Sequence, residues 1–476
     1  MTTPFNGSDT PELPDFPEPK NPGINSAFEG VRRPRINAIA GPILGEFLLG
    51  YTVAILGLWL ASHTSDSAAA TLGLSNQVLE TLYVVFRILA IGMSVVITQS
   101  LGGQQHELAK RTALAGLGAC TWLGVGVVAI LLLGNAQILS VLNAPSEIIP
   151  LAVPYLQLLA PAALLDAYNL TMASILRAHL HARDSLKVMV AMHSTHLVLA
   201  FPLMLGVGKW DGLGLYGFAV ALLISRALGI WMHLWLWRTR MGIVPKAHEW
   251  WQLHLRMLAP VLKFGVPGAT SELGYRAAFM VSLATTARLG VVALATHSYT
   301  FQLLRYVFLI SLSIGWACEI MVGRLIGAGQ FRQAHDLVRK GVRNGQMASG
   351  TLAIVAALAA PWLMRIFTKD PQVIHAAQTL LWIAVALETG RVFNLIVTGA
   401  LRATGDAIYP VLSSVGSFAL VLGVGSYWMG RHFGLPGIFI VYAADEWVRG
   451  LLVMARWHWH GWLPHAREAQ RRIRRF

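Results

Sequence analysis

Apolar stretches long enough for a helix to cross a bilayer recur along most of the chain. They begin near residues 36, 68, 108, 149, 186 and 213 in the first half, and near residues 258, 291, 333, 373, 410 and 436 in the second half. No stretch alternates apolar and polar residues with the period of two that a half-buried strand shows. Glycine and proline fall mostly where such helices would end or kink. The pattern predicts an all-α membrane protein with about twelve transmembrane helices.

The two halves of the chain match each other at a single ungapped shift. Pro42 falls on Pro267, 225 residues later. Chance agreement between two stretches rich in Leu, Ala and Gly is the alternative explanation, but it does not account for matches in Gln, Asn and Arg. Internal repeats that face each other are how many secondary transporters build one central cavity. Further matched pairs are Gln77 and Gln302, Gly102 and Gly327, Asn169 and Asn394, and Arg177 and Arg402.

The repeat divides the chain into two lobes and three other segments. We predict an N-lobe at 36–240 and a C-lobe at 258–456, related by a parallel repeat of about six helices each and joined by a cytoplasmic linker at 241–257. Proline alternates with acidic residues in 1–35, which predicts a disordered cytoplasmic tail rather than a cleaved signal peptide. Residues 457–476 predict a basic cytoplasmic tail that lies on anionic lipid headgroups.

Composition and charge placement indicate a membrane protein with both ends in the cytoplasm. The chain is 55% hydrophobic and only 13% charged, whereas soluble domains carry about 25% charged residues. With the N-terminus inside, the inner connections hold 24 Lys and Arg residues and the outer connections hold five, counted from the sequence. This bias predicts a multi-pass protein of the cell inner (plasma) membrane with both termini cytoplasmic. It also accounts for the net charge of +14 without a nucleic-acid partner.

The sequence lacks the motifs of soluble enzyme chemistry. It has no GxxxxGK(S/T) loop for ATP, no HExxH motif, and only two cysteines, Cys120 and Cys318, both inside predicted helices. We therefore predict no catalytic residue, no metal site and no cofactor, and expect that the chain is not an enzyme. An ion gradient of Na+ or H+ then remains as the energy source, and carboxylates inside the spans are the residues that would bind such an ion.

Two acidic residues follow the first proline of each half. Glu46 lies four residues after Pro42, and Glu272 lies five residues after Pro267. Proline removes a backbone donor and so frees a carbonyl oxygen, and a freed carbonyl beside a carboxylate can hold Na+ or a proton. The alternative for Glu46 is an ion pair with an arginine of residues 32–35 at the membrane edge.

A polar helix face in the C-lobe is a second candidate site. Glu388, Arg391 and Asn394 are spaced by three residues and share this face. Arg391 could hold Glu388 ionised for ion binding, or neutralise it in a permanent structural pair. The equivalent N-lobe positions carry Asp166 and Asn169, so an acid replaces a base and the lobes should differ in chemistry. The other acids inside spans are expected to form structural pairs; they are Glu80, Glu319, Asp445 and Glu446.

Six segments of the chain together match one protein family in their order, spacing and duplication; they are 42–46, 65–73, 265–275, 322–330, 388–394 and 401–406. Through these segments the chain resembles the multidrug and toxic compound extrusion (MATE) family over roughly residues 36–456. The resemblance implies two six-helix lobes in a V shape, and export of amphipathic, often cationic compounds in exchange for Na+ or H+. Family members often bind the coupling ion with acids on helices seven and ten, which implies that role for Glu272 and Glu388. Tyr275 stands where many members carry the helix-seven acid, and Gly57 where many carry a helix-one Asp.

The sequence therefore predicts a secondary active antiporter, with a small-molecule substrate and the lipid bilayer as partners, acting as a monomer. The coupling-ion candidates are Glu272 and Glu388 in the C-lobe, and Glu46 and Asp166 in the N-lobe, where Gly57 replaces the family's Asp. The alternative is a flippase for a lipid-linked precursor, which would need several basic residues around its cavity. Residues expected to line the substrate cavity or support the site are Arg391, Asn394, Asn169 and Tyr275.

Overall fold

The computed structural model describes residues 26–28 and 34–475. Within these ranges the chain is all-helical, which confirms the predicted all-α class, and its only β contact is an isolated bridge between Val207 and Trp210. Predictions for residues 1–25, 29–33 and 476, which include most of the N-terminal tail, lie outside the described residues.

Nine helical segments of the described residues are long and apolar enough to cross a membrane. The chain is therefore a multi-pass membrane protein, as its hydrophobic pattern predicts. In chain order the elements are η1 (Ser26–Phe28), α1 (Ile36–Thr64), α2 (Asp66–Leu82), α3 (Val84–Gly102), α4 (His106–Leu133), α5 (Asn135–Val141), α6 (Ile149–Ala178), α7 (Ala182–Leu205), α8 (Leu215–Leu236), η2 (Trp237–Met241), η3 (Ala247–Trp250), α9 (Leu255–Ala287), α10 (Val291–Gly327), α11 (Phe331–Leu358), α12 (Ala360–Met364), α13 (Pro371–Thr404), α14 (Ile408–Ser417), η4 (Phe418–Val424), α15 (Gly425–His458) and α16 (Leu463–Arg474).

Helix ends and breaks follow from local sequence. Asp370 caps α13 with a side chain that accepts from the Gln372 amide at 2.9 Å, and Pro371 occupies the first helical turn. Gly434 adopts φ 60° and ψ −147° just before Pro436, so α15 is kinked there. Such a positive φ is accessible to glycine at no steric cost.

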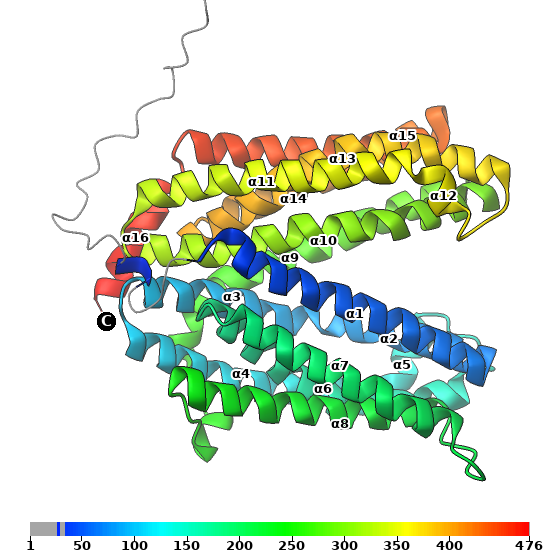
Figure 1. Ribbon diagram of the computed structural model, residues 1–476, viewed down its shortest axis with the longest axis horizontal. Coiled ribbons are helices and arrows are strands. Elements are labelled where there is room, and N and C mark those ends of the chain that lie inside the picture. Colours follow the sequence, from blue (N-terminus) through cyan, green and yellow to red (C-terminus); the bar gives the residue numbers. More distant parts are fainter. Residues whose placement is uncertain (1–25, 29–33, 476) are drawn as a thin grey trace, which may run out of the picture.

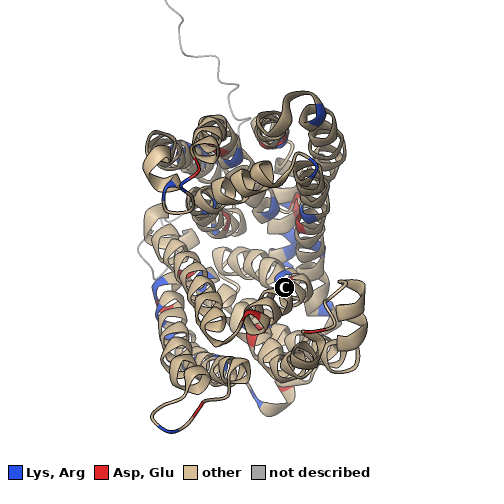
Figure 2. Cartoon of the chain, turned by 90° about the vertical axis from the view of Figure 1, so that its right-hand side faces the viewer, with Lys and Arg blue, Asp and Glu red and all other residues tan. Residues whose placement is uncertain are grey.

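The helices form two groups that lie side by side (Figure 1). Helices α1–α8 make up the N-terminal half and α9–α15 the C-terminal half, and the halves meet at the end that carries α16. Toward the opposite end the two groups diverge, and a view from that end separates an upper from a lower group (Figure 2). Helix α3 packs closely on α9, because Gly92 and Gly265 each face a backbone carbonyl of the other helix.

The joint between the halves is reciprocal at the shift of 225 residues. A Cβ added to Gly102 would overlap the carbonyl oxygen of Arg324, and a Cβ added to Gly327 would overlap that of Gln99. Gln99 and Arg324 are themselves matched by the repeat, as are Gly102 and Gly327. The ends of α3 and α10 therefore lie together at one end of the molecule, as a parallel repeat requires and an inverted one does not.

Side chains cap this joint in the same reciprocal way. The amide nitrogen of Gln99 donates to the carbonyl oxygen of Ala403 at 2.8 Å. The guanidinium of Arg324 donates to the carbonyl oxygen of Ala178 at 3.2 and 3.0 Å. Ala178 and Ala403 are also matched by the repeat. Each half thus satisfies a free carbonyl at a helix end of the other half.

Parts of both terminal segments pack on the body of the protein. Within the predicted tail 1–35, Ala27 and Phe28 are buried, in an apolar cluster that includes residues of α1 and α10. Within the predicted tail 457–476, α16 packs on the body of the protein through one apolar face. Sequence reasoning missed both contacts, because a single aromatic residue and a short helix with four widely spaced apolar positions give little hydrophobic signal.

Candidate functional site

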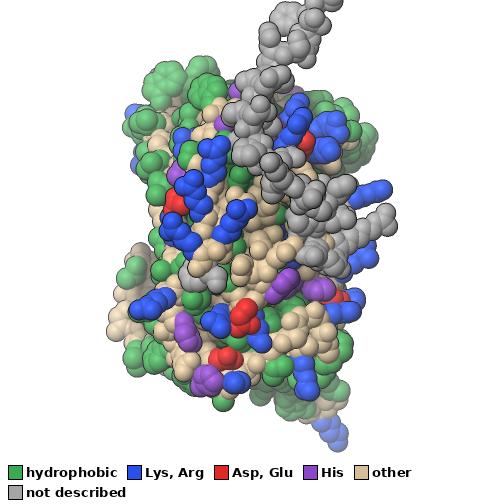
Figure 3. All heavy atoms as spheres, turned by 90° about the vertical axis from the view of Figure 1, so that its left-hand side faces the viewer, with side chains coloured by type: hydrophobic (Ala, Val, Ile, Leu, Met, Phe, Trp, Pro, Cys, Tyr) green, Lys and Arg blue, Asp and Glu red, His purple; other side chains and the backbone are tan. Residues whose placement is uncertain are grey.

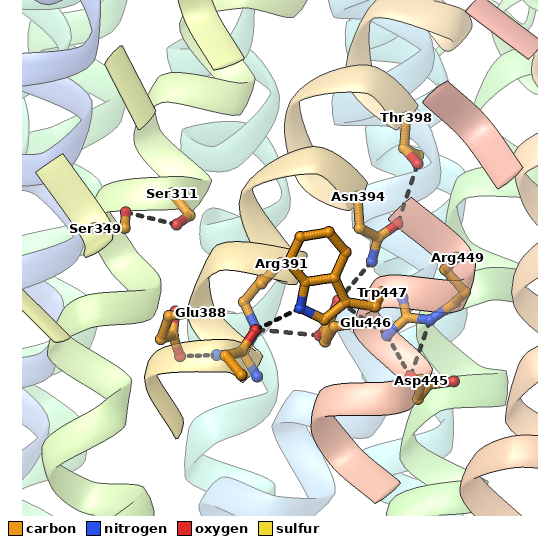
Figure 4. A network of polar contacts seen from close by, with 11 residues as sticks. Ser311, Ser349, Glu388, Arg391, Asn394, Thr398, Asp445, Glu446, Trp447 and Arg449 are labelled. Atoms are coloured by element: carbon orange, nitrogen blue, oxygen red, sulfur yellow. Dashed lines mark hydrogen bonds and ion pairs between the residues drawn. The ribbon is translucent and has the colours of Figure 1, made fainter. Parts of the chain in front are cut away.

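A cluster of buried charged residues lies where α13 crosses α15 (Figure 4). Close approach of the helices brings it together: a Cβ on Gly390 would lie 2.7 Å from the Trp447 ring, and one on Gly450 would lie 3.0 Å from the Gly390 carbonyl oxygen. Small residues at a crossing let helix backbones approach closely inside a membrane. The Trp447 indole also donates to the carbonyl oxygen of Ala386 at 2.8 Å.

Arg391 is the centre of this cluster. Its guanidinium forms an ion pair with Glu388 on the same helix, and its Nε lies 3.1 Å from Oε1 of Glu446 on α15. Asn394 donates from its amide to the second oxygen of Glu446 at 2.8 Å. The face predicted from the sequence, with Glu388, Arg391 and Asn394, is therefore directed at α15.

A second arginine continues the network along α15. Arg449 pairs with Asp445 and lies 3.1 Å from Oε2 of Glu446. Asp445 also accepts a hydrogen bond of 2.6 Å from Ser417 at the end of α14. The prediction that Asp445 and Glu446 form structural pairs is confirmed, with Arg449 as the shared partner, but both acids belong to the same network as Glu388.

The charges in this network do not balance. It holds three acids, Glu388, Asp445 and Glu446, against two bases, Arg391 and Arg449, so one negative charge is left over when all are ionised. All five are buried, with Glu388 at 0% exposure. Among the described residues, Oε2 of Glu388 has no hydrogen-bond partner. An uncompensated charge in a membrane interior is costly, so the arrangement favours binding of one proton or cation, most readily at Glu388.

Tyr275 reaches the edge of this network through aromatic contacts. Its ring stacks on Phe279 at 5.9 Å and meets Phe418 edge-on at 5.7 Å. Phe418 in turn lies under the Arg449 guanidinium, 4.7 Å away. Tyr275 is thus placed beside the charged cluster, separated from it by an aromatic ring.

Glu272 does not share an ion pair with Glu388. It pairs with Arg87 of α3 in the other half, and with Arg276 one turn along α9 at 3.2 Å. Arg276 also lies 3.6 Å from Glu80 of α2, so four alternating charges form a ladder between the halves. The side chains of Glu80 and Arg87 are 65% and 40% exposed, so this ladder is not enclosed by the protein.

Asp166 in the N-terminal half forms a balanced pair instead. Its Oδ1 lies 2.6 Å from Nε of Arg226 on α8, and Tyr83, at the break between α2 and α3, donates to its Oδ2 at 2.9 Å. Asn169 donates to the carbonyl oxygen of Arg226 at 3.0 Å and contacts the His233 ring nitrogen at 3.2 Å. The equivalent position in the C-terminal half is the base Arg391, which pairs with an acid, so the two halves carry ion pairs of opposite polarity.

Glu46 is also balanced by one arginine. Nη1 of Arg177 lies 2.7 Å from its Oε2, and both side chains are buried. Arg177 lies at the end of α6 and is not one of the arginines of residues 32–35 that the sequence suggested as a partner. Residues 32 and 33 lie outside the described residues. Gly57 of α1 faces the ring of Phe218. A Cβ added to Gly57 would lie 2.9 Å from that ring, so a larger side chain at this position would collide with Phe218.

The residues that sequence reasoning undervalued are Glu446, Asp445 and Arg449 in the C-terminal half and Arg226 and Tyr83 in the N-terminal half. One signal was present: a charge inside a span requires a partner, and Arg449 stands within one helical turn of both Asp445 and Glu446. No group of three or more His, Cys, Asp or Glu residues is placed to hold a metal ion in the described part of the chain.

The fold and the site are those of a multi-pass membrane protein with ion pairs buried inside its spans, and comparison with known sequences identifies the family. The MatE family matches residues 42–202 and, separately, residues 267–428. The chain therefore belongs to the MatE family. The two matched segments begin 225 residues apart, the same shift that the sequence repeat and the joint between the halves show.

The similar proteins include a transporter and several multidrug resistance proteins. The chain is 28% identical over 431 residues to the uncharacterized transporter YisQ of Bacillus subtilis, covering 90% of this chain and 94% of that protein. It is 24% identical over 428 residues to the probable multidrug resistance protein NorM of Thermotoga maritima, covering 88% and 91% of the two chains. A solved multidrug resistance MATE family transporter in an outward-facing conformation has the same fold, with a TM-score of 0.82 at 17% identity over 90% of this chain and 96% of that one.

Proposed function

We propose that the chain is a proton-coupled antiporter that exports amphipathic cations, with Glu388 as the residue that takes the proton. The observation that carries this proposal is the surplus of one buried acid in the network of α13 and α15. A carboxyl that is protonated in one state and ionised in another can shift the balance between the two open forms of a carrier, because the proton binds them unequally.

A proton fits this position better than Na+. Glu388 already contacts the guanidinium of Arg391, and a metal cation at the same carboxylate would be repelled by that charge. A proton on the free Oε2 needs no cavity and leaves the Arg391 contact in place. Glu46 and Asp166 are each matched by one arginine, so we place the coupling site in the C-terminal half.

The ladder between the halves supports an amphipathic cation as substrate. Glu80 and Glu272 bring a carboxylate from each half to the same ladder, where they are 65% and 24% exposed, and Arg276 contacts both. A substrate cation can replace Arg276 at Glu80, where the separation of 3.6 Å indicates a weak contact. We therefore assign Glu272 to the substrate path rather than to the proton site.

The layout that we propose is two lobes of six spans each, at 36–240 and 258–456, with the linker at 241–257 between them. Beside the nine apolar segments, α9 and α11 are long helices that carry more charge, and the segment Ile408–His458 contains two spans because α15 breaks at Gly434. Together these would make twelve spans. Basic side chains and histidines gather on the face at the end where the halves meet (Figure 3). We propose that this face is cytoplasmic, so that the form described here opens outward.

The flippase alternative finds less support in the geometry. Of the arginines inside the spans, Arg87, Arg226, Arg276, Arg391 and Arg449 are ion-paired. Arg305 lies over the Tyr51 ring at 4.7 Å. A flippase for a pyrophosphate-linked lipid would instead present several unpaired basic residues to one cavity.

Reconstitution in liposomes tests the proposed function directly. The purified protein is incorporated into vesicles loaded with a fluorescent lipophilic cation. In separate experiments the outside is made either more acidic than the inside or richer in Na+, so that H+ or Na+ is driven into the vesicle. We expect the pH gradient alone to drive efflux of the cation above the rate of protein-free vesicles. Efflux driven by the Na+ gradient alone would contradict proton coupling, and efflux under neither gradient would contradict ion-coupled export.

The orientation of the chain can be measured independently of transport. A reporter enzyme that is active only in the cytoplasm, fused after Phe476, should be active, because the basic face and α16 are proposed to lie inside. The matched control carries the same reporter in the connection at 206–214, on the opposite side, and should be inactive. The reverse pattern of activities would place α16 outside and refute the orientation.

A further inference from the structure

Helix α16 lies across the joint between the two halves. On the N-terminal half, a Cβ added to Gly103 would lie 2.6 Å from Cγ2 of Ile473. On the C-terminal half, Glu468 lies 3.5 Å from Nζ of Lys263, and His465 lies 3.8 Å from Asp406. The helix belongs to the C-terminal half by its connection to α15, so its contacts with α3 bridge the halves. Its buried residues are Leu463, Ala466, Ala469 and Ile473.

Arg472 makes the polar part of this bridge. Its Nη2 donates to Oε1 of Gln99 at 2.9 Å, while the amide nitrogen of Gln99 donates to the carbonyl oxygen of Ala403 at 2.8 Å. The Arg472 guanidinium also lies 5.4 Å from the ring of Phe264 on α9. Gln99 is fully buried, so both ends of its amide are satisfied only while α16 is docked.

Arg472 lies at a place where the two sides of the reciprocal joint differ. Arg324, the repeat partner of Gln99, has its own guanidinium and donates twice to Ala178. Gln99 has no guanidinium and offers an amide oxygen, which accepts from Arg472. One side of the joint is therefore held by residues of the repeat alone, and the other is completed by α16.

We propose that α16 is a latch that holds the cytoplasmic end of the carrier closed, and that inward opening requires α16 to release Gln99 and Gly103. The inference rests on the proposed function, in which this end must separate during the cycle. Separation of α3 from α10 moves Gln99 away from Arg472 and exposes Ile473 to water. The docked latch thus stabilises the outward-open form relative to the inward-open form.

Accessibility of the joint tests the latch without any transport measurement. Cys120 and Cys318, both buried, are replaced by Ala, and Thr98→Cys serves as reporter because Thr98 packs against Gly323 across the joint. A membrane-impermeant maleimide is applied to the cytoplasmic side of inverted vesicles. Arg472→Ala should raise the labelling rate about tenfold, which corresponds to about 1.4 kcal/mol in the closed-to-open equilibrium.

The matched control is Arg471→Ala, which removes the same charge from the exposed face of the same helix and should leave labelling unchanged. Arg472→Lys, which keeps a donor for Gln99, should give an intermediate rate. Equal labelling of Arg472→Ala and Arg471→Ala, with both proteins monodisperse on size exclusion, would overturn the latch. No gradient or substrate is present, so this result is independent of whether the proposed export occurs.

A reversible cross-link provides the second arm and keeps Arg472 in place. Gly103→Cys and Ile473→Cys, introduced together in the background without Cys120 and Cys318, are neighbours in the closed form. Oxidation should join them, abolish export and leave substrate binding intact, and reduction should restore export. Single-cysteine proteins treated in the same way should show no change. Undiminished export by the fully cross-linked protein would refute the latch. Absence of export even in the reduced protein would count against the proposed function and not against the latch.

Discussion

Glu388→Gln should abolish gradient-driven efflux and reduce it to the rate of protein-free vesicles. The amide keeps the shape of a protonated carboxyl, and it brings the network to two acids and two bases, so no charge remains to be neutralised by an incoming proton. The variant should fold and bind the fluorescent cation with an affinity near that of the wild type, because Glu388 is buried on α13 away from the ladder. Binding is measured by equilibrium titration in detergent and efflux in vesicles with an imposed pH gradient.

Two controls separate coupling from structural damage. Glu107→Gln changes an acid that is 64% exposed on the surface of α4 and should transport normally. Asp166→Asn removes an acid that is balanced by Arg226 and should lower stability without uncoupling the remaining transport. If Glu388→Gln transports like the wild type while Asp166→Asn or Glu46→Gln does not, coupling lies in the N-terminal half and the assignment of Glu388 is wrong.

Arg391→Met should produce the largest loss of stability of any single change in the site. It leaves three buried acids against the single base Arg449 and removes a partner from both Glu388 and Glu446. Removing one member of a buried ion pair typically costs about 3–5 kcal/mol, because the other charge stays buried without compensation. We expect a loss of that size in the free energy of unfolding, measured by denaturant titration in detergent.

The matched comparison is Arg111→Met, which breaks an ion pair with Glu107 in which both side chains are largely exposed. Exposed pairs contribute about 0–1 kcal/mol, so this variant should unfold almost as the wild type does. Arg391→Met combined with Glu388→Gln should recover much of the loss, because both sides of one pair are then removed. A single variant Arg391→Met as stable as Arg111→Met would show that the acids of the network are already neutral.

The positions of the helices were readable from the sequence. The predicted starts near residues 36, 149 and 291 coincide with the first residues of α1, α6 and α10. Apolar length and proline carry this information because a helix end is a local event. The repeat also predicted that the ends of α3 and α10 lie on one side, since an ungapped parallel duplication allows no other arrangement.

The partners of the buried charges were not readable in the same way. Periodicity placed Glu388, Arg391 and Asn394 on one face, but it could not say which helix that face meets. Glu446, 55 residues after Arg391, is brought there by the crossing of α13 and α15. Likewise Glu272 pairs with Arg87, 185 residues away in the other half. The periodicity of a sequence shows which residues share one face of a helix. The partners of those residues depend on which other helix packs against that face, and periodicity does not contain this information.

The contact of Gly102 and Gly327 with backbone carbonyls also bears on leakage. Long side chains at a closure can stretch and keep partial contact as the parts move away, which permits a graded series of half-open forms. Here main chain also meets main chain beside the side chains of Gln99, Arg324 and Arg472, so a small separation loses this close part of the contact outright. A carrier with such a closure would spend little time partly open at both sides, and under the proposed coupling protons would have no continuous path along which to dissipate the gradient.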